Sequence, residues 1–283
     1  MRTAFRDLLA GVEPLVMPGA HDAISARLIA RANFKAYFIG GFPLVGARYG
    51  LRDVGLAALG EIAAGVRDIM AACDLPVLVD GDNGYGDAKT AVHVLHTYER
   101  MGAEAIFFED QVSPKRCGHM AGKLLMPLER MEATLRAVSG ERMRPQTFII
   151  ARTDARELHG LDEALRRGER YLRAGADGLF IEAPVSLEEL ARVGSAFEGV
   201  PQLANMLEGG RTPLLPPAEL GRLGFSMAIY GISLLMHATR AMQGVLAELA
   251  RGSVDFAGGG VGFEEYKDIV GFDRWSRIEA AYG

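Results

Sequence analysis

The sequence predicts an α/β protein, a (β/α)8 barrel of the TIM type, and three observations support that fold. Eight short apolar runs recur along the 283 residues, and stretches with helical spacing lie between them. The runs are too continuously apolar for strands with one solvated face, which favours a parallel sheet covered by helices. No linker-like change of composition divides the chain, so one domain over 1–283 is expected. An open, doubly wound sheet is the alternative.

The elements follow one another in a regular order. Two phrases, RMGAEAIFFED and RAGADGLFIEA, share one layout, in which a glycine ends a helix and a buried strand then ends at an acid. This layout is typical of a βα unit. The predicted strands are 15–19, 36–41, 75–80, 105–110, 147–153, 178–184, 201–206 and 227–231, and the clearest helical stretches are 22–32, 56–73, 88–102, 128–140, 161–175 and 186–197.

Beyond the last predicted strand the chain continues as a helical extension, about 232–283. It contains LLMHATRAMQGVLAELARG, a glycine-rich turn FAGGGVGF, and the amphipathic EEYKDIVGFDRWSRIEAAYG. An extension of this kind is expected to pack on a neighbouring subunit or to cap the barrel.

Composition excludes several classes of function. The net charge is −5, and no basic stripe of the kind that binds nucleic acid is present. The opening MRTAFRDLLAGVEPLVMPG carries acids within its apolar run, which fits neither a signal peptide nor a membrane span. No membrane partner is therefore expected, and the cytoplasm is the expected location. With Cys73 and Cys117 as the only cysteines, a disulfide framework is excluded.

Polar residues follow the predicted strands at their carboxyl ends, where the active site of such a barrel lies. One acid at a strand end could serve as a helix N-cap, but several carboxylates at one mouth need a cation. The residues concerned are Asp80 and Asp82, Glu109 and Asp110, Arg152 and Asp154, Glu182, and Asn205.

The segment DGDNGYG is a candidate metal site. Asp80 and Asp82 are two residues apart, so they face the same way in an extended segment. Hard oxygen ligands with room for water suit Mg²⁺ or Mn²⁺. The alternative is that Asp82 and Asn83 are only turn residues in a glycine-rich loop, and Glu109 at a neighbouring strand end favours the metal.

The loop 113–123 is long for a βα connection and is cationic. It carries Lys115, Arg116, Cys117, His119 and Lys123. Long loops over a barrel mouth often act as lids. Nearby cations lower the pKa of a thiol, which makes Cys117 a better proton donor or, when ionised, a nucleophile. A spectator cysteine is the alternative, and a zinc site is disfavoured because a second ligand pair is missing.

Motifs in order along nearly the whole chain resemble the isocitrate lyase/phosphoenolpyruvate mutase superfamily. The motif KRCGH resembles the cysteine-loop branch, which includes 2-methylisocitrate lyase, 2,3-dimethylmalate lyase, oxaloacetate hydrolase and carboxyphosphonoenolpyruvate mutase. The matching pieces are GAHDAISARLI, GLRDVGL, VDGDNGYG, FFEDQVSPKRCGHMAGK, FIIARTDARELHGLDEALRRGERYLRAGADGLFIEAP and LANMLEGGRTPLLPPAELGRLGF.

The resemblance implies a barrel whose last helix is swapped with a partner, in dimers paired into tetramers. It implies Mg²⁺ held by Asp82 directly and by Asp80 and Glu109 largely through water, with Asp53 nearby. A small anionic carboxylate would bind at the same mouth. The other residues that it implies are Cys117, Arg152, His119 and Glu182 for catalysis, and Gly40, Gly41, Phe42, Asn205, Lys115 and Arg116 for substrate binding.

The expected reaction is Mg²⁺-dependent cleavage of a carbon–carbon bond in a small 2-hydroxy di- or tricarboxylate, such as 2-methylisocitrate or a methylated malate. Phosphorus–carbon bond formation, or hydrolysis or decarboxylation of oxaloacetate, is the alternative in the same site. The sequence departs from the lyase pattern at one place. A lyase typically has Tyr-x-Ser-Gly-Gly at its second strand end, where this chain has Phe38 and Gly40, followed by Phe42. A hydroxyl that could relay the alkoxide proton is missing there, and Phe42 is expected to take up pocket space.

Overall fold

The computed structural model describes residues 5–11, 13–116, 122–256 and 259–283. Each of the eight predicted runs forms a strand, and every strand pair is parallel. The strands are β1 (Leu15–Pro18), β2 (Tyr37–Ile39), β3 (Val77–Asp80), β4 (Ala105–Glu109), β5 (Phe148–Thr153), β6 (Gly178–Ile181), β7 (Leu203–Asn205) and β8 (Met227–Tyr230).

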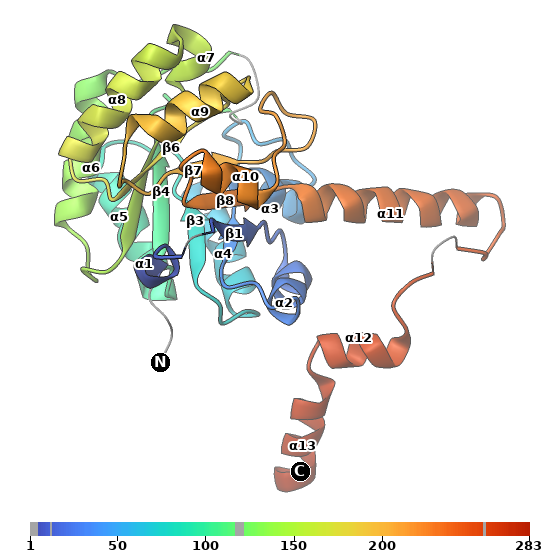
Figure 1. The fold of residues 1–283 in the computed structure, drawn as a ribbon. Helices are drawn as coiled ribbons and strands as arrows, with labels where there is room; N and C mark the ends of the chain where they lie inside the picture. Colours follow the sequence, from blue (N-terminus) through green and yellow to red (C-terminus); the bar gives the residue numbers. More distant parts are fainter. Residues whose placement is uncertain (1–4, 12, 117–121, 257–258) are drawn as a thin grey trace.

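Helices surround these strands (Figure 1). Two predicted helix ends are visible in the backbone: Gly102 after α5 and Gly175 after α8 have φ of 102° and 107°, which favours glycine. The helices are α1 (Phe5–Leu8), α2 (Ala23–Arg31), α3 (Gly41–Tyr49), α4 (Leu59–Met70), α5 (Ala88–Met101), α6 (Leu128–Gly140), α7 (Ala155–His159), α8 (Leu161–Arg173), α9 (Leu187–Ala196), α10 (Pro217–Arg222), α11 (Ser233–Ala250), α12 (Phe263–Ile269) and α13 (Phe272–Tyr282).

The strands follow one another around a ring, but continuous ladders do not run all the way around it. One sheet has the order β2-β3-β4-β5-β6 and the other β1-β8-β7. Single parallel bridges link the two sheets, from Gly19 to Phe38 and from Leu179 to Gln202. Ala20 N–H also donates to the Phe38 carbonyl at 2.8 Å. The order is that of a (β/α)8 barrel rather than of an open doubly wound sheet, with two seams in its hydrogen bonding.

Large apolar side chains fill the interior of the ring. Phe38, Phe107 and Phe180 form a row in which Phe38 stacks on Phe107 at 5.9 Å and Phe107 meets Phe180 edge-on at 5.5 Å. All three side chains are buried. A second cluster lies between the strands and the outer helices, which include α4, α5 and α6. The barrel is therefore a packed core, and a pocket can form only at its mouth.

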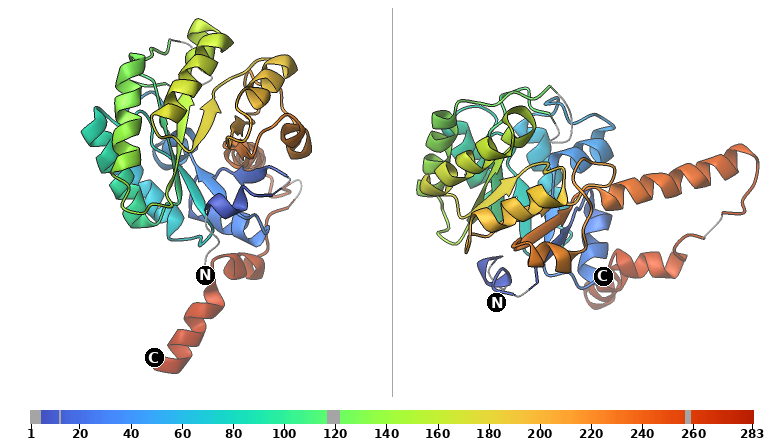
Figure 2. Two further views of the ribbon diagram at one scale, coloured as in Figure 1. Left: turned by 60° about the vertical axis from the view of Figure 1, so that its left-hand side comes forward. Right: turned by 45° about the horizontal axis from the view of Figure 1, so that its top comes forward.

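The C-terminal helices project from the barrel (Figures 1 and 2). No residue of α11 is buried. α12 returns to α2, where Arg31 pairs with Asp268 at 2.7 Å and Ile269 is buried. Packing of these helices on a second subunit stays a prediction. Among the described residues, none of the helices combines the length and the apolar character needed to cross a membrane.

Candidate active site

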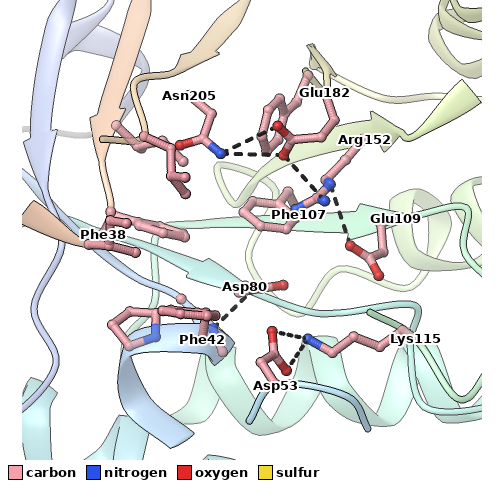
Figure 3. Close-up of a pocket in the computed structure, with 18 of the residues that line it drawn as sticks. Phe38, Phe42, Asp53, Asp80, Phe107, Glu109, Lys115, Arg152, Glu182 and Asn205 are labelled. Atoms are coloured by element: carbon pink, nitrogen blue, oxygen red, sulfur yellow. Dashed lines mark hydrogen bonds and ion pairs between the residues drawn. The ribbon is translucent and has the colours of Figure 1, made fainter. Parts of the chain in front are cut away.

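A pocket lies at the carboxyl ends of the strands (Figure 3). It brings together most of the residues predicted from the sequence. Asp82 lines a second pocket instead, and Asp53 and Lys115 line both. Cys117 and His119 fall outside the described residues. The predicted site residues that line the first pocket are Gly40, Gly41, Phe42, Asp53, Asp80, Glu109, Lys115, Arg116, Arg152, Glu182 and Asn205.

Arg152, at the end of β5, is the central cation of the pocket. Its Nε and Nη2 donate to the Asp154 carboxylate at 3.0 and 3.1 Å. Nη2 is also 3.2 Å from Glu182 Oε2, and Nε is 3.4 Å from Glu109 Oε2. Burial opposes the charge, but these carboxylates outweigh it and hold the pKa of Arg152 well above its ordinary value. The guanidinium is therefore charged and fixed before any substrate arrives.

Asn205 and Glu182 line the pocket next to Arg152. Asn205 Nδ2 lies 3.4 Å from both carboxylate oxygens of Glu182. Glu182 is buried, and its Oε1 also accepts the backbone N–H of Ala183 at 3.0 Å. Adjacent strands β6 and β7 thus present one carboxylate and one amide side by side, as Figure 3 shows.

An acidic cluster, Asp53, Asp80 and Asp82, faces Arg152 across the pocket, and Glu109 lies next to the guanidinium. Lys115 is its cation: Nζ lies 2.8 Å from Asp53 Oδ1 and also contacts Asp82 Oδ1. The Asp80 carboxylate accepts the backbone N–H groups of Asp82 at 2.8 Å and of Gly41 at 3.2 Å. Lys115, near the start of the cationic loop, thereby links the loop to Asp53 and to Asp82, which follows β3.

Burial raises the pKa of three carboxyls around the pocket, those of Asp53, Asp80 and Glu109. Desolvation and the neighbouring Asp82 raise the pKa of Asp80 to about 6. Desolvation also raises the pKa of Glu109 well above its ordinary value, against the attraction of Arg152. The pKa of Asp53 is raised too, by burial first, although Lys115 pulls it down. A divalent cation bound here would favour the ionised carboxylates.

The donor set of the cluster fits a hard divalent cation. The candidate donors, Asp80, Asp82 and Glu109, offer only oxygen, and Oε1 of Glu109 is buried without a hydrogen-bond partner among the described residues. In the parts of the chain that the structure describes, no three acidic, histidine or cysteine side chains already converge as a metal site. The Lys115 ammonium instead occupies the space between Asp53 and Asp82.

Several residues around the site were not assigned a role from the sequence. The Tyr85 hydroxyl donates to Asp82 Oδ2, and Tyr85 itself has φ of 58°. Lys123 Nζ is buried between Asp154 at 2.9 Å and Glu157 at 2.7 Å. Asp154 is thus the residue that fixes Arg152. The sequence showed that Asp154 follows a strand, but it did not show that Asp154 binds Arg152.

A buried hydrogen-bond network joins the ends of β4 and β5. Asp110 is fully buried and accepts from Thr153 Oγ1 at 2.6 Å, Arg167 Nη1 at 3.0 Å and Tyr171 Oη at 2.8 Å. It also accepts the backbone N–H of Asp154 at 3.0 Å. Asp110 therefore serves the frame of the site and does not line the pocket.

The chain matches known proteins over most of its length. The family model described as phosphoenolpyruvate phosphomutase matches residues 5–250. The chain is 40% identical to a 2,3-dimethylmalate lyase of Eubacterium barkeri, covering 100% of this chain and 99% of that protein. It is 38% identical to a 2-methylisocitrate lyase of Bacillus subtilis over 84% of this chain and 78% of that protein.

Solved structures of related enzymes are also similar to the chain over nearly its whole length. An oxaloacetate acetylhydrolase in complex with 3,3-difluorooxalacetate is 28% identical and superposes with a TM-score of 0.92, covering 99% of this chain and 96% of that one. A phosphonopyruvate hydrolase in complex with oxalate and Mg²⁺ is 28% identical with a TM-score of 0.87, over 98% and 97%. The motifs, the strand order and these matches together show that the chain is an enzyme of the isocitrate lyase/phosphoenolpyruvate mutase superfamily.

Proposed function

We propose that this enzyme is a carbon–carbon lyase that cleaves a small 2-hydroxy di- or tricarboxylate with the help of Mg²⁺ or Mn²⁺. The supporting observation is that one pocket holds a buried, fixed guanidinium, Arg152, beside Glu109, whose Oε1 has no hydrogen-bond partner among the described residues, and opposite the carboxylates of Asp53 and Asp80. A substrate with carboxylates at both ends could then be gripped by the cation at one end and by a metal at the other. The two lyases that resemble the chain support the same reaction class.

Asp80, Asp82 and Glu109 would hold the divalent ion, with Asp53 beside them. When bound, such an ion supplies Lewis-acid polarisation of the oxygens of a 2-hydroxy acid. Lys115 would leave the space between Asp53 and Asp82 and remain at the mouth with Arg116, where both cations can face an anionic substrate. Gly41, whose backbone already approaches Asp80, leaves room there because it has no side chain.

The reaction breaks the bond between C2 and C3. The hydroxyl proton leaves as the C2 carbonyl forms, and the electron pair passes to C3, where the adjacent carboxylate spreads the charge. Since Phe38 and Gly40 carry no hydroxyl, a carboxylate of the pocket would accept that proton. The Cys117 thiol, assisted by His119, would protonate C3 to give a 2-oxo acid and a carboxylate.

Arg152 contributes chiefly by position. A charge-assisted hydrogen bond to a substrate carboxylate is stabilising by about 1.5–3 kcal/mol, and the guanidinium needs no reorganisation because Asp154 holds it. Glu182 and Asn205 would complete this end of the pocket. The alternative reactions, phosphorus–carbon bond formation and hydrolysis or decarboxylation of oxaloacetate, would use the same grip on a carboxylate.

The experiment is a substrate panel with purified enzyme and Mg²⁺, comprising 2-methylisocitrate, 2,3-dimethylmalate, isocitrate and oxaloacetate, with detection of 2-oxo acids and oxalate. Pyruvate or glyoxylate from a hydroxy acid, abolished by a chelator and restored by Mg²⁺, is the expected result. If oxaloacetate gives oxalate and none of the hydroxy acids is cleaved, the result would contradict the lyase reaction and support hydrolysis of oxaloacetate. Arg152→Gln should abolish turnover of whichever compound reacts, since it removes the charge at this end.

We also propose that the chain works as a homo-oligomer, a dimer of helix-swapped dimers, in which helices α11 to α13 pack on a second subunit. The supporting observation is an apolar surface on α11 that nothing in the described chain covers: Met242, Leu246 and Leu249 are each more than half exposed. Sedimentation equilibrium of wild type and of Leu246→Glu tests this arrangement. A monomeric wild type would contradict it.

A further inference from the structure

The pocket is divided into a polar and an apolar part, and the division follows the order of the strands. Most of the charged and amide side chains follow β3, β4, β5, β6 and β7, while Asp53 lies between α3 and α4 and the rings of Phe107 and Phe180 also line the pocket. The ends of β2 and β8, which lie on either side of β1, supply carbon instead. We name this part the apolar wall; it consists of Phe38, Phe42, Ile229 and Ile232. Figure 3 shows Phe38 and Phe42 on the side away from Arg152 and Glu109.

Phe38 and Gly40 are sterically coupled in this wall. A Cβ atom placed on Gly40 would lie 2.8 Å from Cε1 and 2.9 Å from Cζ of the Phe38 ring. The ring is also stacked on Phe107, and Gly231 lies against the same Cε1 edge, where a Cβ would be 3.2 Å away. A serine at position 40 is therefore incompatible with the Phe38 ring in its present place, because its Cβ atom would overlap the ring.

The wall therefore offers no hydrogen-bond partner from its side chains. None of its four side chains contains nitrogen or oxygen, and three of them, Phe38, Ile229 and Ile232, are at most 6% exposed. Phe42 is half-buried and stands at the start of α3, over the mouth. A carboxylate driven against this surface would lose water without compensation from the four side chains of the wall, whereas an alkyl group would gain from the same burial.

We infer that the apolar wall selects substrates with an alkyl branch, so that the enzyme prefers an alkyl-substituted 2-hydroxy dicarboxylate to a tricarboxylate. Phe42 is the residue that sets this preference, because it is the member of the wall that is not locked into the barrel core. The inference rests on the proposed function, since it names which 2-hydroxy acid the same pocket takes. Both carboxylates are bound by the polar part, and the branch lies against Phe38 and Phe42.

The size of the preference follows from the burial of carbon. Each methyl group that passes from water to the wall should raise kcat/KM about fourfold, the fold-change that corresponds to about 0.8 kcal/mol per buried methylene. Two methyl groups should therefore give roughly a fifteenfold preference over the unsubstituted acid. A third carboxylate in the same place should lower kcat/KM below that of the unsubstituted acid.

The test compares malate, 3-methylmalate, 2,3-dimethylmalate and 2-methylisocitrate as substrates of the wild type, Phe42→Leu and Phe42→Ser. Phe42→Leu keeps an apolar wall and should retain the order of preference. Phe42→Ser should reduce the advantage of the methylated acids to less than about fourfold. Leu187→Ala, at an exposed position of α9 outside the pocket, is the control and should leave the order unchanged.

A binding measurement separates this inference from the proposed reaction. Succinate, 2,3-dimethylsuccinate and propane-1,2,3-tricarboxylate cannot be cleaved, and their affinity in the presence of Mg²⁺ can be measured by calorimetry. Tighter binding of 2,3-dimethylsuccinate without turnover of any hydroxy acid would support the selection of alkyl groups by the apolar wall and would contradict the proposed lyase reaction. Turnover that is fastest with 2-methylisocitrate, or a methyl preference that survives Phe42→Ser, would overturn the inference and leave the proposed lyase reaction in place.

Discussion

Replacement of Lys115 by methionine tests the acidic cluster most directly. Lys115 is almost fully buried, and its Nζ lies 2.8 Å from Asp53 while also contacting Asp82. Burial would lower the pKa of an ammonium here, but the surrounding acids, Asp82 first, raise it well above its ordinary value. Methionine keeps most of the side-chain volume and removes the charge, so the change isolates electrostatics from packing.

The expected loss of stability is several kcal/mol without metal. Breaking a buried ion pair by removing one partner typically costs about 3–5 kcal/mol, because the other charge stays buried. The protein can reduce this cost by taking up a proton, since Asp80 already has a pKa of about 6. A carboxyl whose folded-state pKa is raised adds stability at low pH and loses it as the pH rises through that pKa. The deficit should thus be near 3 kcal/mol at pH 8 and smaller at pH 5.5.

Urea unfolding of wild type and Lys115→Met at these two pH values, with and without Mg²⁺, gives the measurement. Mg²⁺ should stabilise the variant more than the wild type, because the ion then has no ammonium to displace. Lys89→Met is the matched control: Lys89 pairs with Asp87 at 3.4 Å on the surface and should change stability by less than about 0.5 kcal/mol. A Lys115 variant that is as stable as the control, or indifferent to Mg²⁺, would refute this account of the cluster.

Two further predictions concern the cation at the other end and the loop. At Asp154, burial opposes ionisation, but Arg152 and Lys123 lower the pKa to about 2. Its contribution of about 2 kcal/mol is complete above pH 4 and is lost as the pH falls towards 2, so the stability difference between wild type and Asp154→Asn should shrink over that window in urea titrations; a constant difference would contradict it. Cys117→Ser should lower turnover steeply while calorimetric Mg²⁺ affinity stays unchanged, and unaltered turnover would remove the thiol as the proton donor.

The barrel was predictable because its pattern is local. Each buried run followed by a helix is a self-contained signal, and the glycines at 102 and 175 mark two of the helix ends. The seams at β1/β2 and β6/β7 were not predictable. Register between strands that are distant in sequence depends on the packing of side chains from several elements at once, and no local pattern records it.

The sequence predicted which residues line the candidate site better than it predicted which of them contact one another. Strand ends such as Asp80, Glu109 and Arg152 meet because the carboxyl ends of parallel strands meet. Lys115 was expected to bind substrate, and the structure places it in the acidic cluster. The direction of a loop side chain is set by tertiary contacts: Gln111 holds the backbone of Arg116 through two hydrogen bonds, of 2.9 and 3.0 Å, and so directs the preceding residue inward.

The two ends of the pocket differ in how firmly the fold holds them, and the difference suits the proposed reaction. Arg152 is fixed by Asp154, whose backbone is fixed in turn by the buried Asp110. The cluster at the other end depends on Lys115, which belongs to a loop. A substrate carboxylate can therefore bind to a preformed cation while the acids rearrange around an ion. If Asp110→Asn weakened substrate affinity without changing Mg²⁺ affinity, this separation would be demonstrated; equal losses in both would show that the site moves as one unit.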